Sequence, residues 1–554
     1  MLSSPSDRRR HVRDLGAGVA IVAIALIIGC VGVTRSGPLW VDGPQYANAG
    51  AMIRDWIRSG QLLHPFEFAR ANYAQYPAFS VPYHPPGYPG LLGAFFLMTG
   101  VSYSSARVFI ALLLGLAGCS FYAILRRFAV DRGPAFVCTL LLLTMPEIVT
   151  WSRDTMSEIP ALAFVLVGSF GFLRWLETVR YRDAAFAFGF AALAFFSKIN
   201  VIGVLLAWPF WIALRGPWRK MFSPSFVVPA VLFVAVVAGW SIFFIPFARY
   251  ETQSSMTSAH GAAPLPDANL LVYLYGLPAM TGWSMLVVSV LGLGVALHLP
   301  EWRRSAAMWL AWFGGCLVFL LMLPLHYEAR YLVFALPALA ALAAMLFFAR
   351  TRSRVPEWIA YALAGVALVE NVVRLRHQSS GVTGYKQMAS RLAALNEPGN
   401  VLIGVPFQND LIFRYRSASP ESRRQFIRGD RSITMSLPTY APDADPSRLL
   451  VKGPESFLDL IRRGRVRYVV TVPPAPDSDA DDQIVTDMRI AARNVAALPQ
   501  EFAPVDSFWI DFGGVWPEPD MWVYLWRFRH QLPEGPSEIP ITIPTAGLIY
   551  RPKD

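Results

Sequence analysis

The chain has 554 residues, of which 54% are hydrophobic and only 16% are charged, and its mean hydropathy is +0.40. Soluble globular proteins carry roughly a quarter charged residues, so a wholly soluble protein is excluded. The net charge of +11 does not indicate a nucleic-acid-binding protein. The lysines and arginines stand in short clusters between apolar runs, as expected of the cytoplasmic loops of a membrane protein.

The apolar runs predict a polytopic α-helical membrane protein. The first run, residues 15–33, follows four N-terminal arginines. It is long enough to cross a hydrocarbon core of roughly 30 Å, so we expect an uncleaved span. Because a lone strand cannot satisfy its backbone in lipid, each run is expected to be a helix. With the first run, about eleven transmembrane helices are predicted, the other ten at 104–125, 133–150, 158–177, 183–197, 199–214, 225–247, 282–299, 305–325, 331–349 and 356–373.

The orientation of these helices depends on one further apolar stretch, residues 91–101. If this stretch crossed, all later basic clusters would lie outside. If it lies along the interface or re-enters, they share the cytoplasm with the N-terminal arginines, which the positive-inside rule prefers. We therefore predict a plasma-membrane protein with a cytoplasmic N-terminus. The outer face then receives residues 35–102, 151–158, the turn at Lys198, 249–281 and 326–330.

The first outer loop, residues 35–103, begins with an aspartate at membrane depth. Asp42 follows the first span and precedes a Gly-Pro turn and a helix pattern that includes Tyr46. A carboxylate at this height is well placed to accept a proton from a hydroxyl group, because ionisable groups at membrane depth usually face a functional cavity. The alternative is that Asp42 caps the helix that starts after Pro44.

The same loop ends in a segment rich in proline and tyrosine, PYHPPGYPG. Tyr83 and Tyr88 are candidate platforms for a sugar ring, or members of an aromatic belt at the membrane interface. His84 is a candidate contact to a phosphate or a metal, although a lone histidine of this kind is usually structural.

The second outer loop brings Arg153, Asp154 and Glu158 to a helix entrance, with the two carboxylates four residues apart and so on one helix face. Two carboxylates and a cation at one helix entrance suggest a functional site rather than a helix cap alone. A local contact of Arg153 with Glu158, with capping by Asp154 or Ser157, is the alternative.

Two later segments place cations at the outer mouths of apolar runs. Lys198 interrupts AFFSKINV, and HYEARY at 326–331 carries His326, Glu328 and Arg330. Arginine binds phosphate in a bidentate way and lysine acts as a compact point charge, so these cations suit an anionic lipid phosphate. The alternative is that Lys198 snorkels to the interface and Glu328 pairs with Arg330.

The composition changes after about residue 375, where long apolar runs stop and charges and prolines become frequent. Strand-like runs at 401–405 and 467–472 alternate with helical patterns. We therefore divide the chain into a transmembrane module, 1–375, and a soluble extracytoplasmic α/β or α+β domain, 376–554. This domain contains no phosphate loop, catalytic triad spacing or metal cluster, and acceptor docking, regulation and passive packing are all compatible with it.

Taken in order, these segments resemble the GT-C membrane glycosyltransferases, particularly the protein O-mannosyltransferase and aminoarabinose-transferase branch and the related RgtA/B/C/D-like proteins. The resemblance covers roughly residues 10–375. It rests on five elements: Asp42 with Tyr46, the PYHPPGYP stretch, Arg153-Asp154, the lysine of FFSKIN, and EARYLVFALPALAALAA. His84 departs from the aminoarabinose-transferase branch, which tends to carry lysine there.

The resemblance implies an inverting sugar transfer from a polyprenyl-phosphate donor to a glycan, lipid or protein acceptor outside the cytoplasm. Asp42 would be the general base, with Asp154 as a second catalytic carboxylate, and Lys198, Arg330, His84 and Arg153 would bind the donor phosphate. Substrate contacts are expected from Tyr46, Tyr83, Tyr88, Glu158, His326, Glu328 and Tyr331.

Metal dependence is a separate question. Some GT-C enzymes hold a divalent metal on acidic residues, and Asp42, Asp154 and Glu158 could supply oxygen ligands. The first loop has no DxD motif or dense acidic cluster, so no cofactor is firmly predicted and we favour metal independence.

Two other classes of function also fit these features. A transporter or flippase of a lipid-linked sugar would use the same cations and aromatic residues, but no inverted repeats are evident. A non-catalytic envelope-assembly protein would use the C-terminal domain to bind a partner.

Overall fold

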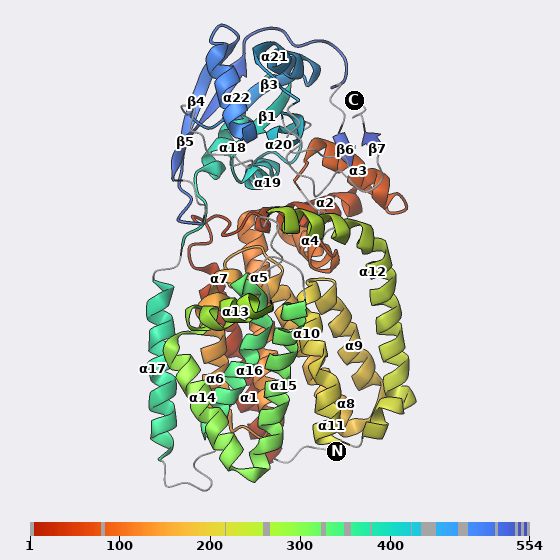
Figure 1. Cartoon of the computed structure of the whole chain (residues 1–554), viewed down its shortest axis with the longest axis vertical. Helices are drawn as coiled ribbons and strands as arrows, with labels where there is room; N and C mark the ends of the chain where they lie inside the picture. Colours follow the sequence, from red (N-terminus) through yellow and green to blue (C-terminus); the bar gives the residue numbers. More distant parts are fainter. Residues whose placement is uncertain are drawn as a thin grey trace.

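The computed structural model describes residues 5–78, 84–216, 218–258, 266–322, 328–347, 356–376, 379–422, 424–433, 450–474, 486–515, 519–537, 541–543 and 548–550. A long bundle of helices carries a smaller domain with a β-sheet at one end (Figure 1). The fold class predicted from the sequence is confirmed.

The helical part of the chain ends with α17. Its elements are α1 (Pro5–Cys30), α2 (Gly43–Ser59), α3 (Pro65–Gln75), α4 (Gly87–Thr99), α5 (Tyr103–Arg127), α6 (Arg132–Thr144), α7 (Pro146–Ser152), α8 (Glu158–Thr178), α9 (Tyr181–Phe195), η1 (Ile199–Val201), α10 (Ile202–Leu205), α11 (Ala207–Arg215), η2 (Trp218–Phe222), α12 (Pro224–Ser258), α13 (Pro266–Thr281), α14 (Trp283–His298), α15 (Pro300–Met322), η3 (Ala329–Ala335), α16 (Leu336–Met345) and α17 (Glu357–Leu375).

Within the described part of the chain, six helices are long and apolar enough to cross a membrane, or up to eight if each of two bent helix pairs is one span. The bends measure 64° between α6 and α7 and 107° between α13 and α14. Helices also occupy the remaining predicted runs, but these are shorter: α9, the η1 to α11 segment, and η3 with α16. The count of eleven spans therefore stays a prediction, although in the described part of the chain each predicted run lies mainly on one helix, a bent pair or consecutive short helices.

The apolar stretch at residues 91–101, on which the predicted orientation depends, lies mostly on α4. This helix has only 13 residues, about 20 Å at 1.5 Å per residue, and so is too short for the hydrocarbon core. It lies beside α2 at the end of the bundle that carries the sheet domain (Figure 1), and the Cα of Gly50 faces the side chain of Leu92. That this stretch lies along the interface or re-enters, and with it the orientation of the bundle, stays a prediction.

The two ends of α1 mark the two ends of the bundle. Near its start, Asp14 accepts a hydrogen bond of 2.8 Å from Arg132, at the beginning of α6. After its end, the N–H of Gly37 donates to the carbonyl of Ser380, just before the sheet domain. The beginning of α1 and the C-terminal domain are therefore at opposite ends. The last of the basic clusters between the apolar runs, Arg350 to Arg354, lies outside the described residues.

The C-terminal domain is an α/β domain. Its elements are α18 (Tyr385–Ala394), β1 (Asn400–Gly404), α19 (Gln408–Ala418), β2 (Phe426–Arg428), α20 (Gly429–Ser432), α21 (Pro454–Arg463), β3 (Val466–Thr471), α22 (Thr486–Ala497), β4 (Phe502–Ile510), β5 (Met521–Phe528), β6 (Ile541–Ile543) and β7 (Leu548–Tyr550). Five strands form a sheet in the order β2-β1-β3-β5-β4, and β6 pairs with β7. β1 is parallel to β2 and β3, whereas β5 runs antiparallel to β3 and β4.

The first outer loop and the C-terminal domain share one hydrophobic core. Tyr76 and Ala78, which follow α3, are buried in the same cluster as Tyr385, Val401 and Val470. Both faces of the sheet are covered, because a second cluster packs α21 and α22 on the other side. The domain is therefore joined to the loop that carries Asp42.

Candidate active site

Asp42 stands directly before α2 and does not cap it. Its backbone is already helical, with φ −83° and ψ −23°, and its side chain accepts no hydrogen bond from a backbone N–H group of the first turn. One carboxylate oxygen instead accepts a 3.1 Å hydrogen bond from Gln45 Nε2. The other lies 3.8 Å from Arg330 Nη2. The carboxylate is one-quarter exposed, so it is available to a bound hydroxyl group.

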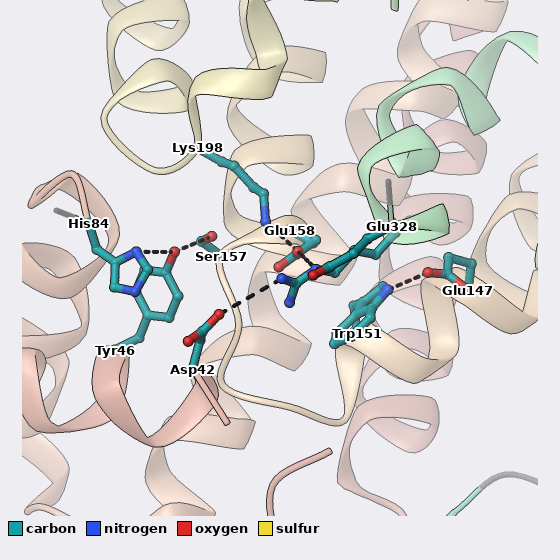
Figure 2. Close-up of polar contacts among 10 residues, drawn as sticks. Asp42, Tyr46, His84, Glu147, Trp151, Ser157, Glu158, Lys198 and Glu328 are labelled. Atoms are coloured by element: carbon teal, nitrogen blue, oxygen red, sulfur yellow. Dashed lines mark hydrogen bonds and ion pairs between the residues drawn. The ribbon is translucent and has the colours of Figure 1, made fainter. Parts of the chain in front are cut away.

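Arg330 is the centre of the cluster. It is the second residue of η3, in the HYEARY segment, and its side chain is 7% exposed. Its Nε lies 3.8 Å from Glu158 Oε1, and Glu328 is its closest ion-pair partner. Lys198 reaches the same Glu158 oxygen at 2.5 Å (Figure 2). Segments far apart in the sequence therefore bring three carboxylates and two cations together, which we call the acid–base cluster: Asp42, Glu158, Lys198, Glu328 and Arg330.

Three aromatic rings hold the Arg330 guanidinium in place. Its Cζ lies 4.7 Å from the ring centre of Trp40, 5.6 Å from that of Trp151 and 5.4 Å from that of Tyr331. Such cation–π contacts are strongest where water is excluded. Glu147 accepts a 2.6 Å hydrogen bond from Trp151 Nε1 and so fixes the orientation of that ring (Figure 2).

A second hydrogen-bonded group lies beside Asp42. Ser157 Oγ donates to the Tyr46 hydroxyl at 3.0 Å, and that hydroxyl lies 3.1 Å from His84 Nδ1. The Tyr46 and His84 rings stack with centres 4.3 Å apart. Burial lowers the pKa of His84 to about 4, so the imidazole is neutral at pH 7. Burial also raises the pKa of Tyr46, so its hydroxyl keeps the proton that Nδ1 can accept. Tyr88 is fully buried and donates to the carbonyl of Thr155 at 3.0 Å.

Asp154 lies apart from the cations and supports the backbone around Asp42. It is in the turn between α7 and α8, so it does not share a helix face with Glu158 as the four-residue spacing predicted. Its oxygens accept N–H groups from Leu39 at 2.9 Å and Thr155 at 2.6 Å. Burial raises its pKa to about 7. Arg153 donates to the carbonyl of Ile28, at the end of α1.

Sequence reasoning found the charged members of the cluster but not the residues that hold them. Trp40 and Trp151 were each two residues from a candidate, yet tryptophan near a membrane interface usually indicates only a belt. Glu147 gives no local signal at all. Tyr83 and His326, predicted to contact substrate, lie outside the described residues.

No group of three or more His, Cys, Asp or Glu side chains in the described part of the chain is arranged to hold a metal ion. The three candidate oxygen ligands are separated in their contacts: Asp154 binds backbone N–H groups, whereas Glu158 binds Lys198 and Arg330. Metal independence stays a prediction.

Part of the sequence matches a known family. The family model for dolichyl-phosphate-mannose-protein mannosyltransferase matches residues 83–243, 161 of the 554 residues. This stretch includes His84, Glu158 and Lys198. No curated protein sequence matches the chain.

Solved structures match over most of the chain. ArnT from Cupriavidus metallidurans in the apo state has a TM-score of 0.58 at 15% identity, covering 92% of this chain and 98% of ArnT. ArnT bound to undecaprenyl phosphate has a TM-score of 0.55 at 16% identity, covering 92% and 97%. The arabinofuranosyltransferase AftD from Mycobacteria has a TM-score of 0.53 at 14% identity, covering 94% of this chain and 40% of AftD. At these identities the matches show a shared fold.

Proposed function

The chain has the fold of the GT-C membrane glycosyltransferases, and from this premise we propose that it transfers a sugar from a polyprenyl-phosphate donor to an acceptor hydroxyl group. The observation that carries the proposal is the acid–base cluster, in which the partly exposed Asp42 carboxylate stands beside the buried Arg330, and Glu158 joins Arg330 to Lys198. ArnT, which has this fold, binds undecaprenyl phosphate, and this supports a polyprenyl-phosphate carrier for the present chain.

Asp42 is the proposed general base. It is available because its carboxylate caps no helix and is partly exposed. The acceptor oxygen attacks the anomeric carbon while the bond from that carbon to the phosphate oxygen breaks. Asp42 takes the hydroxyl proton, and the polyprenyl phosphate leaves with the bonding electrons. Attack opposite the leaving group inverts the anomeric centre.

Arg330 and Lys198 are the proposed partners of the leaving phosphate. Developing negative charge is stabilised most by cations that are already oriented in a site with little water. The Arg330 guanidinium is held by three aromatic rings, and Lys198 is held by Glu158 while its Nζ lies 5.2 Å from the Tyr331 ring centre. The proposed role of Glu158 is therefore to orient both cations rather than to contact the substrate directly.

The neighbouring residues have supporting roles. Tyr46 and His84 lie where they can contact the sugar or the acceptor, and the neutral imidazole offers hydrogen bonding rather than charge to a phosphate. Asp154 is proposed to position Asp42 through the backbone of Leu39. Arg153 is proposed to hold the end of α1.

The proposed site faces the outside of the plasma membrane. The beginning of α1, with its neighbouring arginines, lies at the opposite end of the bundle from the C-terminal domain. If the arginines are cytoplasmic, the domain and the acid–base cluster are extracytoplasmic.

The test is product formation by the purified full chain, incubated with a panel of undecaprenyl-phosphate sugars and with glycan, lipid and protein acceptors. Release of undecaprenyl phosphate together with a glycosylated acceptor is the expected result. A protein that moves the intact donor across a proteoliposome membrane and forms no product would instead be the transporter.

A further inference from the structure

The acid–base cluster carries one more negative charge than positive charge when all its members are ionised. Three carboxylates, Asp42, Glu158 and Glu328, face two cations, Lys198 and Arg330. A donor phosphate brings further negative charge. Its binding is opposed by repulsion unless one carboxylate moves away from the cations.

Glu158 and Asp42 are poorly suited to move. Glu158 is fully buried and bridges both cations, so withdrawing it would leave the Lys198 ammonium without an ion-pair partner among the described residues. Asp42 is fixed by the start of α2 and by Gln45, and its Oδ2 lies 3.8 Å from Arg330.

Glu328 differs from Glu158 in its exposure and in having one ion pair, and it differs from both carboxylates in its backbone and in its distance from Arg330. It precedes η3 in extended backbone, with φ −116° and ψ 128°, and its side chain is 27% exposed. Among the described residues its ion pair is with Arg330 alone. It is also the carboxylate nearest to Arg330, so it occupies the position in which a phosphate oxygen would gain most from the guanidinium.

Arg330 can exchange one anion for another without moving. Its three aromatic rings hold the guanidinium independently of Glu328. The residue is 93% buried, and its Nη1 has no hydrogen-bond acceptor in the described part of the chain. A buried N–H group without an acceptor is costly, so a hydrogen bond from it to an arriving anion contributes strongly to binding.

We propose that in the free protein the Glu328 carboxylate occupies the place of the donor phosphate on Arg330, and that it must leave Arg330 before the phosphate can bind. This competition sets the affinity for the polyprenyl phosphate. The inference rests on the proposed function, because it concerns the same donor. In the free protein Glu328 neutralises Arg330. In the complex the phosphate takes its place, and Glu328 turns outward to solvent.

The test compares binding of undecaprenyl phosphate and undecaprenol to the full chain in nanodiscs, for the wild type, Glu328→Gln and Glu328→Ala. Both variants remove the competing charge, so each is expected to bind undecaprenyl phosphate roughly tenfold or more tightly. Undecaprenol has no phosphate, and its affinity is expected to stay the same. Glu67→Gln is the matched control, because it removes one exposed carboxylate from α3, away from Arg330.

The outcomes separate this inference from the proposed function. If the wild type binds undecaprenyl phosphate but neither variant binds it more tightly, Glu328 does not compete and only the inference is overturned. An equal gain for undecaprenol has the same meaning, because the phosphate would then not be involved. If the wild type does not bind undecaprenyl phosphate, the proposed function is overturned as well.

Discussion

At the scale of single residues, the site depends on a guanidinium that is fixed by rings as much as by charge. Lysine would keep the charge of Arg330 but lose the guanidinium group that lies over the Trp40 ring and its fork of donors. We therefore expect Arg330→Lys to lower kcat/KM for the polyprenyl-phosphate sugar by roughly 10²–10³-fold, the usual effect of losing one fixed electrostatic contact.

Steady-state kinetics of the purified protein measure this effect. Arg391→Lys is the control, because Arg391 is 44% exposed in the C-terminal domain. Equal activity of Arg330→Lys and the wild type would mean that charge alone is enough at this position.

His84 makes the stability of the folded protein depend on pH. Its pKa is lowered by burial from 6.5 to about 4, so the folded protein keeps it neutral while the unfolded chain binds a proton below about pH 6.5. The stability that it contributes is therefore full above pH 6.5 and is lost as the pH falls towards 4. Thermal unfolding between pH 7.5 and 4.5 should show a smaller decrease in Tm for His84→Asn than for the wild type. Parallel curves would show that His84 has no such role.

The sequence predicted which residues carry the chemistry better than it predicted which residues they contact. Asp42, Lys198 and Arg330 attract attention because ionisable groups at membrane depth are costly. Whether Glu158 pairs with Arg153 or with Lys198 depends on how the helices pack, so local spacing left Arg153 open as an alternative and did not indicate Lys198. Asp154 looked like Glu158 in sequence, but its oxygens bind backbone N–H groups.

At the scale of elements, the start of α2 must lie close against the turn between α7 and α8. A Cβ added to Gly43 would lie 2.4 Å from Asp154 Oδ1, whereas one added to Gly90 in α4 would meet nothing within 4 Å. Gly43→Ala should therefore displace Asp42, lower activity by about tenfold or more and destabilise the fold by roughly 1–3 kcal/mol.

Gly90→Ala is the matched control and should retain activity, with unchanged or slightly higher stability, because alanine is the better helix former. Activity and denaturation midpoints of the two variants measure the difference. If both variants behave alike, the close approach of Gly43 to Asp154 is not important.

At this scale the sequence predicted which segments form helices, but it did not predict how those helices bend. As far as the structure describes them, the long apolar runs are helical, because lipid leaves no other way to satisfy the backbone. The 107° bend between α13 and α14, by contrast, depends on tertiary contacts such as Glu370, which accepts the N–H groups of Trp283 and Ser284. No apolar pattern reports such a contact.

At the scale of the whole molecule, the C-terminal domain holds the helix that begins beside Asp42. Arg416 of α19 is nearly fully buried, pairs with Asp55 of α2 at 2.8 Å and lies over the Tyr76 ring at 4.6 Å. Asn48 of α2 donates to the carbonyl of Asn409. The sequence predicted a separate domain but could not predict this contact, because residues 48 and 416 are far apart in the chain.

Removing this contact should loosen α2. We expect Arg416→Ala to speed amide exchange throughout α2 and to lower kcat, because the carbonyl of Asn48 loses a charged donor. Arg527→Ala is the control, since Arg527 forms a half-exposed pair with Glu397 within the C-terminal domain. Unchanged exchange in α2 would mean that the domain is a passive neighbour.

The most direct test of the central claim is the reaction of Asp42→Asn, which keeps the shape of the side chain and removes its basicity. The account predicts that purified Asp42→Asn binds undecaprenyl phosphate as the wild type does and loses sugar transfer by at least about a hundredfold, the contribution expected of a general base. Sugar transfer at the wild-type rate by a folded Asp42→Asn protein would contradict it.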